Sequence, residues 1–341
     1  MRKYSVLCAS WGLVLAALSP SLANASSVYV AEWYTDTVAV IDTSTDTVIH
    51  HIPVGDGPMG IAANPAETRV YVGLAGSNSV AVIDTTTDTV ITAVEIGSSP
   101  SGLAYNGVLH RIYVTGGNSV TVIDAVSNKV VDTITGIGNV GACSCVTVSR
   151  AGDRVYVADW VSGFGGYIHV IDTATDEIVK AVYVASNLSG VAESSDGKYV
   201  YTSDWIWNGD RGPNMRILDT ADYSLNVFEW PGDGTGSSVL PSPDGTRLYA
   251  PSFSELRIID LATGTHTPLP LAGSGQGAAD YSYGVGFSPE DNKLYVAASG
   301  FDVVNVVDTA RSRYLGAITV GYFPNGLVVL TGGAIFHGDF E

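Results

Sequence analysis

The residues best suited to chemistry are three acid–tryptophan pairs at the same point of a recurring pattern. Each pair directly follows a strand-like segment that contains a tyrosine. Tryptophan offers a large apolar face with a polar edge, and the adjacent carboxylate adds negative charge. Such pairs suit stacking on a sugar, a ring or a cation. The pairs are Glu32-Trp33, Asp159-Trp160 and Asp204-Trp205.

Further aromatic residues stand in the segments that follow these pairs or that join successive repeats. Because large exposed aromatic patches usually mark contact sites, the set predicts a binding surface for a small molecule, a carbohydrate or a protein. The alternative is that these rings pack between repeats or brace the longer loops. The additional candidates are Tyr34, Phe164, Trp207, Tyr283 and Tyr322.

Catalytic and metal-binding patterns are not evident. The six histidines are scattered, and the residues expected to ring a central channel include no Asp, Glu or His. The serines in that ring have no basic partner nearby to activate them. Hard divalent metals need several oxygen ligands, most of them charged. The sequence therefore predicts no catalytic residues, no metal and no cofactor.

The elements that position the candidates belong to a repeat of four short strands, A to D. Strand B carries a tyrosine, as in VYVAEW from residue 28, and strand C ends in an aspartate, as in AVIDT ending at Thr43. Each phrase occurs seven times in strict alternation. Four antiparallel strands at this period predict an all-β, seven-bladed β-propeller.

The two ends of the repeat array complete one blade. The array starts with a strand B at Val28 and finishes with a lone strand A over residues 324–328. Three strands from one end and one from the other predict a 3+1 closure of the first blade by the C-terminal strand. Such closure removes the open edges of the sheet.

Loop lengths place the candidates on one face. The separation between the strand B tyrosine and the strand C aspartate is longest in the fourth and fifth repeats, at 16 and 18 residues. The segments that lead into the fourth and seventh repeats are also long. All these insertions fall in B–C and D–A loops, which share one face of a propeller. The sequence predicts the binding site there, as an acidic and aromatic cleft.

The repeat resembles the YVTN family of β-propeller repeats. The shared pattern is VYV or IYV, then VIDT, then a strand followed by a P-x-G-I/L-A segment, and it covers about residues 28–330. The resemblance implies a bacterial, secreted scaffold more than an activity. Related propellers include lactone hydrolases and a lyase, and similar ones accompany quinone-cofactor systems.

The first 25 residues are typical of a secretory signal. Arg2 and Lys3 precede an apolar stretch too short to span a bilayer, and Ala23-Asn24-Ala25 is a small-x-small cleavage pattern. We expect cleavage after Ala25, a propeller over 26–331 and a tail over 332–341. The mature protein should be secreted or periplasmic, with no stable membrane insertion.

Charge and cysteine content restrict the partners. The formal net charge of −18 disfavours nucleic acid and anionic membranes. Cys143 and Cys145 are two residues apart, and an extended strand holds such Cα atoms about 6.5 Å apart or more. That separation favours free thiols, although an oxidising compartment favours a disulfide. The sequence does not indicate the oligomeric state.

These observations favour a non-enzymatic binding or scaffold propeller outside the cytoplasm. One alternative is a hydrolase or lyase that acts on a small cyclic or sugar-derived substrate, in the manner of a lactonase. A second alternative is an accessory subunit of a quinone-cofactor redox system.

Overall fold

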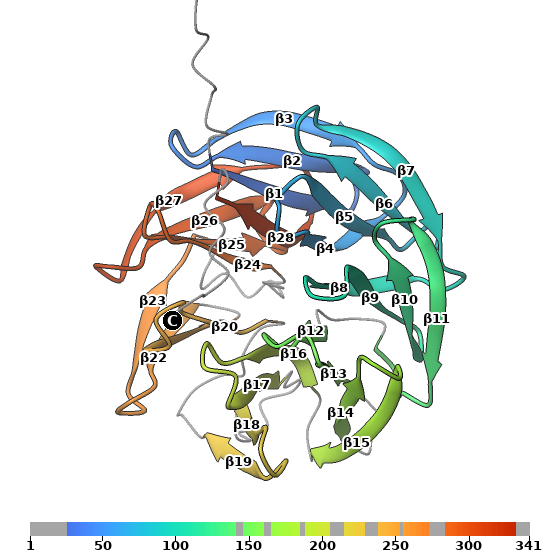
Figure 1. Cartoon of the computed structure of the whole chain (residues 1–341). Coiled ribbons are helices and arrows are strands. Elements are labelled where there is room, and N and C mark those ends of the chain that lie inside the picture. Colours follow the sequence, from blue (N-terminus) through green and yellow to red (C-terminus); the bar gives the residue numbers. More distant parts are fainter. Residues whose placement is uncertain are drawn as a thin grey trace, which may run out of the picture.

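The computed structural model is a ring of seven four-stranded antiparallel sheets, in agreement with the predicted propeller (Figure 1). The residues that it describes are 26–140, 146–159, 165–184, 188–204, 215–228, 238–252, 255–272 and 284–331. None of these residues belongs to a helix long and apolar enough to cross a membrane.

The first four blades follow one another around the ring, each with its strands in the order A, B, C and D from the centre outwards. Blade 1 contains β28 (Pro324–Leu330), β1 (Ser27–Glu32), β2 (Thr37–Asp42) and β3 (Thr47–Pro53). Blade 2 contains β4 (Pro58–Ala63), β5 (Arg69–Leu74), β6 (Ser79–Asp84) and β7 (Thr89–Glu95). Blade 3 contains β8 (Pro100–Asn106), β9 (Arg111–Gly116), β10 (Ser119–Asp124) and β11 (Lys129–Thr135). Blade 4 contains β12 (Val146–Val148), β13 (Arg154–Ala158), β14 (Gly166–Asp172) and β15 (Glu177–Val184).

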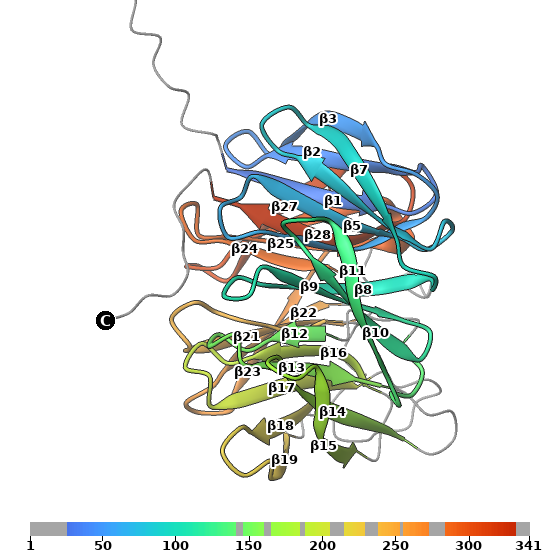
Figure 2. The ribbon, with the colours of Figure 1, turned by 45° about the vertical axis from the view of Figure 1, so that its right-hand side comes forward.

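The other three blades complete the ring, with the inner strands near the centre and the outer strands at the rim (Figure 2). Blade 5 contains β16 (Leu188–Glu193), β17 (Tyr199–Asp204), β18 (Met215–Asp219) and β19 (Leu225–Phe228). Blade 6 contains β20 (Leu240–Pro241), β21 (Arg247–Pro251), β22 (Glu255–Asp260) and β23 (His266–Pro270). Blade 7 contains β24 (Val285–Ser288), β25 (Lys293–Ala298), β26 (Val303–Asp308) and β27 (Arg313–Thr319), with a short 3-10 turn, η1 (Ser299–Phe301), after β25.

The hydrophobic core lies between neighbouring blades. Strands B and C read as continuous Val, Ile and Tyr runs because both of their faces are covered, and β5 is buried from Val70 to Leu74. One cluster joins Tyr29 and Val40 of blade 1 to Val72 of blade 2. Each blade is therefore stabilised mainly by its neighbours.

Glycines let the innermost strands approach one another closely. A Cβ atom on Gly60 would lie 2.3 Å from the carbonyl oxygen of Ser101, and one on Gly326 would lie 2.5 Å from that of Met59. No side chain fits at these distances, which explains the recurring strand A glycine.

The C-terminal strand closes blade 1. In the antiparallel pairing of β28 with β1, Tyr29 is opposite Val328 and Ser27 is opposite Leu330. This is the pairing that the split repeat predicts. It leaves β1 with hydrogen-bonded neighbours on both sides, since β1 also pairs with β2.

Tyrosine–aspartate bonds tie the blades together on the face made by the A–B and C–D turns. The Tyr29 hydroxyl donates to Asp88 of the next blade at 2.5 Å, and the Tyr295 hydroxyl donates to Asp46 at 2.9 Å. Asp46 and Asp88 stand four residues after the strand C aspartates Asp42 and Asp84. They are turn residues, with φ of 53° and 51°, but each also accepts the tyrosine of the preceding blade.

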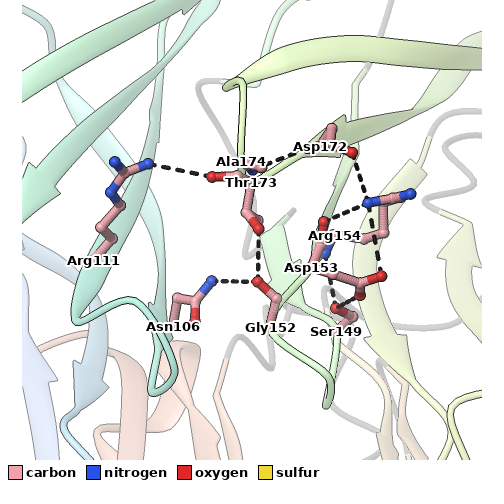
Figure 3. A network of polar contacts seen from close by, with 9 residues as sticks. All are labelled: Asn106, Arg111, Ser149, Gly152, Asp153, Arg154, Asp172, Thr173 and Ala174. Atoms are coloured by element: carbon pink, nitrogen blue, oxygen red, sulfur yellow. Dashed lines mark hydrogen bonds and ion pairs between the residues drawn. The ribbon is translucent and has the colours of Figure 1, made fainter.

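Between blades 3 and 4, side chains also donate hydrogen bonds to backbone carbonyl groups of the next blade (Figure 3). Arg111 donates to the carbonyl oxygen of Thr173 at 3.3 Å, and Asn106 donates to that of Gly152 at 2.7 Å. Arg111 also forms an ion pair with Asp176 at 2.7 Å, and Asp176 accepts the Tyr113 hydroxyl. The strand B tyrosine and the basic residue two positions before it therefore bind the same turn of the next blade.

Candidate functional site

Four aromatic residues gather at the B–C and D–A loops of blade 1, on the face that the loop lengths indicated. The ring centroids of Tyr34 and Tyr322 are 5.1 Å apart, and those of Tyr34 and Phe323 are 5.5 Å apart. Trp33 meets Tyr34 edge-on at 6.5 Å. Tyr34 and Tyr322 are 61% and 56% exposed. We call Trp33, Tyr34, Tyr322 and Phe323 the blade 1 aromatic cluster.

Backbone hydrogen bonds hold the two loops of the cluster against each other. Trp33 N–H donates to the carbonyl oxygen of Phe323 at 3.1 Å, and Tyr34 N–H donates to that of Tyr322 at 3.3 Å. Phe323 N–H donates to Asp302 of blade 7 at 2.9 Å. Phe323 has a φ of 63°, which is strained for a bulky residue. The exposed rings therefore stand on a fixed backbone.

The Glu32 carboxylate is completely buried beneath this cluster. Its Oε1 accepts the backbone N–H of Gly321 at 2.5 Å, and its Oε2 accepts the Thr37 hydroxyl at 2.5 Å. His51 Nδ1 lies 3.1 Å from Oε2. The sequence predicted that Glu32 faces a ligand. The structure instead makes it a brace between strands B, C and D and the D–A loop.

Asp159 is a similar structural brace in blade 4, where it connects strand C with the D–A loop. Its side chain is buried and accepts the backbone N–H groups of Gly138, in the D–A loop, and Tyr167. His169 Nε2 lies 2.7 Å from Asp159 Oδ2, the oxygen that also accepts the Gly138 N–H. Burial opposes ionisation, but the bonds from His169 and the two N–H groups outweigh it and lower the pKa of Asp159. The expectation of a ligand-facing acid is thus corrected here too.

Replacement of this acid should cost stability in a pH-dependent way. The lowered pKa means that Asp159 stabilises the fold above its ordinary value of 3.8, and this contribution is lost as the pH falls below it. We expect Asp159→Asn to destabilise the protein by about 2 kcal/mol at neutral pH, because two N–H donors face an amide. Denaturant unfolding at neutral pH and near pH 3 measures this. A difference between variant and wild type that does not shrink in acid contradicts the assignment.

The remaining predicted site residues are placed only in part. Asp204 is the last residue of β17, where it pairs with Leu188. Other predicted residues lie outside the described part of the chain: Trp160, Phe164, Trp205, Trp207, Tyr283, Cys143 and Cys145. The structure therefore brings together Trp33, Tyr34 and Tyr322, and adds Phe323.

The central channel is lined by small and aliphatic residues. A cavity of about 150 Å³ lies among Gly60, Leu103, Val146, Val191 and Leu327. Of the serines predicted to ring it, Ser101 has a structural partner, since its hydroxyl donates to the carbonyl oxygen of Val140 at 2.5 Å. Among the described residues, no three His, Cys, Asp or Glu side chains form a group that could hold a metal ion.

Comparison with curated proteins gives a partial match. No family model matches the chain. Over 124 residues the chain is 30% identical to the seven-bladed beta-propeller protein Rv1057 of Mycobacterium tuberculosis. The match covers 35% of this chain and 30% of the length of that relative.

Solved structures share the fold at low sequence identity. A protein of unknown function from Desulfotomaculum acetoxidans has a TM-score of 0.67 at 14% identity, covering 89% of this chain and 99% of that one. The dihydro-heme d1 dehydrogenase NirN has a TM-score of 0.62 at 15% identity, covering 91% and 75%. Kuenenia stuttgartiensis hydrazine synthase has a TM-score of 0.52 at 19% identity, covering 87% and 84%. These similarities identify the fold alone.

Proposed function

We propose that this protein is a non-enzymatic, extracytoplasmic binding propeller of the YVTN-repeat kind, and that its B–C/D–A face binds carbohydrate. The observation that carries the proposal is the blade 1 aromatic cluster. Tyr34 and Tyr322 expose more than half of their surface, yet their loops are fixed by hydrogen bonds. Rigid aromatic rings stack on a ligand with little loss of conformational entropy.

The buried acids favour a neutral ligand over a cationic one at this cluster. Glu32 is completely buried and fully occupied by loop donors, so it supplies no exposed charge to the rings. Tyrosine rings stack on the apolar faces of sugar rings, and their hydroxyl groups bond to sugar hydroxyls. A saccharide therefore fits the cluster better than a bare ammonium ion does.

One observation supports a location outside the cytoplasm: the first 25 residues have the three parts of a secretory signal. The formal net charge is −18. This negative charge favours solubility, because the acidic residues are spread over all seven repeats. A protein chain that presents aromatic side chains remains a second kind of partner for the same surface.

A redox-associated role is the second candidate function. It is suggested by the names of two structural neighbours, hydrazine synthase and a dihydro-heme d1 dehydrogenase. A cofactor-bearing protein purified from its native host would show a visible absorption band, whereas the carbohydrate proposal requires none. A lactonase-like hydrolase would instead open a lactone ring during incubation with the purified protein.

The proposal predicts a loss of binding without a loss of stability. We expect cellobiose to bind with an affinity of about millimolar, and Tyr34→Ala and Tyr322→Ala each to weaken it by about tenfold, since a stacked ring contributes about 0.5–1.5 kcal/mol. Isothermal titration calorimetry measures the affinity, and differential scanning calorimetry measures the Tm. Tyr183→Ala is the matched control, because Tyr183 is 53% exposed on β15. Equal affinity in all three variants would exclude the cluster as the binding site.

A further inference from the structure

A cavity of about 550 Å³ opens between blades 5 and 6 on the face opposite the blade 1 aromatic cluster. It lies at the A–B and C–D turns of the two blades. Its volume is within the range of small-molecule sites. We call it the inter-blade groove, and its larger side chains are Tyr199, Tyr201, Ile217, Pro241 and Leu261.

The groove exists because the repeat changes at this junction. At two other junctions, a basic residue two positions before the strand B tyrosine binds an aspartate of the next C–D turn: Lys293 binds Asp46 at 2.8 Å and Arg111 binds Asp176 at 2.7 Å. Figure 3 shows Arg111 reaching the equivalent turn of blade 4. In blade 5 the basic position holds Tyr199, and in blade 6 the aspartate position holds Gly264. The cation and its acceptor are thus both missing.

The missing acceptor leaves the strand B tyrosine of blade 5 without a bond. Tyr201 is only 5% exposed and lines the groove. Tyr29, Tyr113 and Tyr295 each donate to an aspartate, but within the described parts of the chain no hydrogen bond reaches the Tyr201 hydroxyl. The Tyr201 hydroxyl is not one of the fully buried polar atoms and opens onto the groove, so it is free to bond to a ligand.

Two carboxylates stand at the rim of the groove, and because Asp196 forms an ion pair with Lys198 at 2.9 Å, the uncompensated negative charge among the described residues is that of Asp244. The bonds that Asp196 receives from Lys198 and Ser194 lower its pKa to about 2, and the Ser242 hydroxyl lowers the pKa of Asp244. Both acids therefore stay ionised at neutral pH. No basic residue is among the described residues that line the groove.

We infer that the inter-blade groove binds a small organic ammonium ion with an apolar body, which takes the place of the basic side chain found at two other junctions. The partly buried ring of Tyr199 attracts a cation through its ring electrons, and Asp244 adds attraction at the rim. The Tyr201 hydroxyl bonds to a polar group of the ligand. This site is independent of the proposed carbohydrate site, since it lies on the other face.

Calorimetric titration with choline tests the inference, with 3,3-dimethylbutan-1-ol as its uncharged analogue of the same shape. We expect choline to bind with an affinity of about millimolar and the neutral alcohol to bind at least about tenfold more weakly. Tyr34→Ala, on the opposite face, should leave choline binding unchanged, which separates this test from that of the carbohydrate site. Absence of choline binding, or equal binding of the alcohol, overturns the inference.

Two variants locate the bound cation. Tyr199→Arg restores the basic residue of the repeat. It should weaken choline binding by more than about tenfold, because the arginine side chain fills the groove and its positive charge repels the ammonium ion. Tyr201→Phe keeps the ring and removes the unpaired hydroxyl, and it should weaken binding by about threefold. The Tm of Tyr201→Phe should be unchanged or higher. If Tyr199→Arg binds choline as tightly as the wild type, the groove is not the binding site. If Tyr199→Arg does not fold, unchanged choline affinity in Tyr201→Phe contradicts the assignment instead.

Discussion

Removal of residues 324–341 is expected to abolish cooperative folding. The deletion takes away β28, which pairs with β1 along Ser27 to Glu32 and buries Leu327 and Leu330. It exposes the backbone donors and acceptors of β1 and opens the ring between blades 7 and 1. The cost should exceed the whole stability of a typical domain, which is about 5–15 kcal/mol. Circular dichroism during heating should show no cooperative transition.

A shorter deletion is the control for this experiment. Removal of residues 332–341 keeps β28 and the bond from Thr331 N–H to Glu67 at 2.9 Å. We expect its Tm to match that of the full chain. A longer deletion that melts at the same temperature as this control would show that closure by β28 does not stabilise the ring.

Glu32→Gln is expected to cost about 3 kcal/mol of unfolding free energy, the largest effect of any single substitution considered. The change keeps the shape of the side chain but replaces one acceptor by an NH2 group. Gly321 N–H, the Thr37 hydroxyl and His51 all face the carboxylate, so at least one donor loses its acceptor. Buried donors without partners carry most of this cost. In calorimetry the Tm should fall by about 5 °C.

The same substitution should weaken ligand binding indirectly. Gly321 directly precedes Tyr322, so loss of its bond to Glu32 loosens the loop that presents the ring. Glu95→Gln is the matched control, since Glu95 is exposed at the end of β7. If Glu32→Gln and Glu95→Gln have equal Tm values, Glu32 does not act as a brace.

The fold could be predicted from the sequence because the same four-strand pattern recurs seven times. The strand B tyrosine and the strand C aspartate fix the order of the strands, and the split repeat fixes the pairing of β28 with β1. The aspartate that ends strand C also begins the next turn, since Asp42 accepts the N–H of Ser44 at 2.7 Å. Local periodicity and turn chemistry suffice for these features.

The roles of individual site residues could not be predicted in the same way. Glu32 ends strand B of blade 1, and Asp159 directly follows strand B of blade 4. Their charge alone suggested that both side chains would be exposed on the B–C/D–A face. Their burial depends on N–H donors from the D–A loop, Gly321 and Gly138, which are distant in sequence. The inter-blade groove depends likewise on Tyr199 and Gly264 in different repeats. Comparison of equivalent repeat positions identifies Tyr199 and Gly264 as departures from the repeat, but it does not identify the burial of the two acids.

A crystal soaked with cellobiose tests the central claim most directly. We predict density for a sugar ring stacked against Tyr34 or Tyr322 on the B–C/D–A face of blade 1, and weaker density in crystals of the Tyr34→Ala variant soaked at the same millimolar concentration. Sugar bound at another place on the propeller, or a cluster that stays free at saturating concentration, would contradict the assignment of this surface as the binding site.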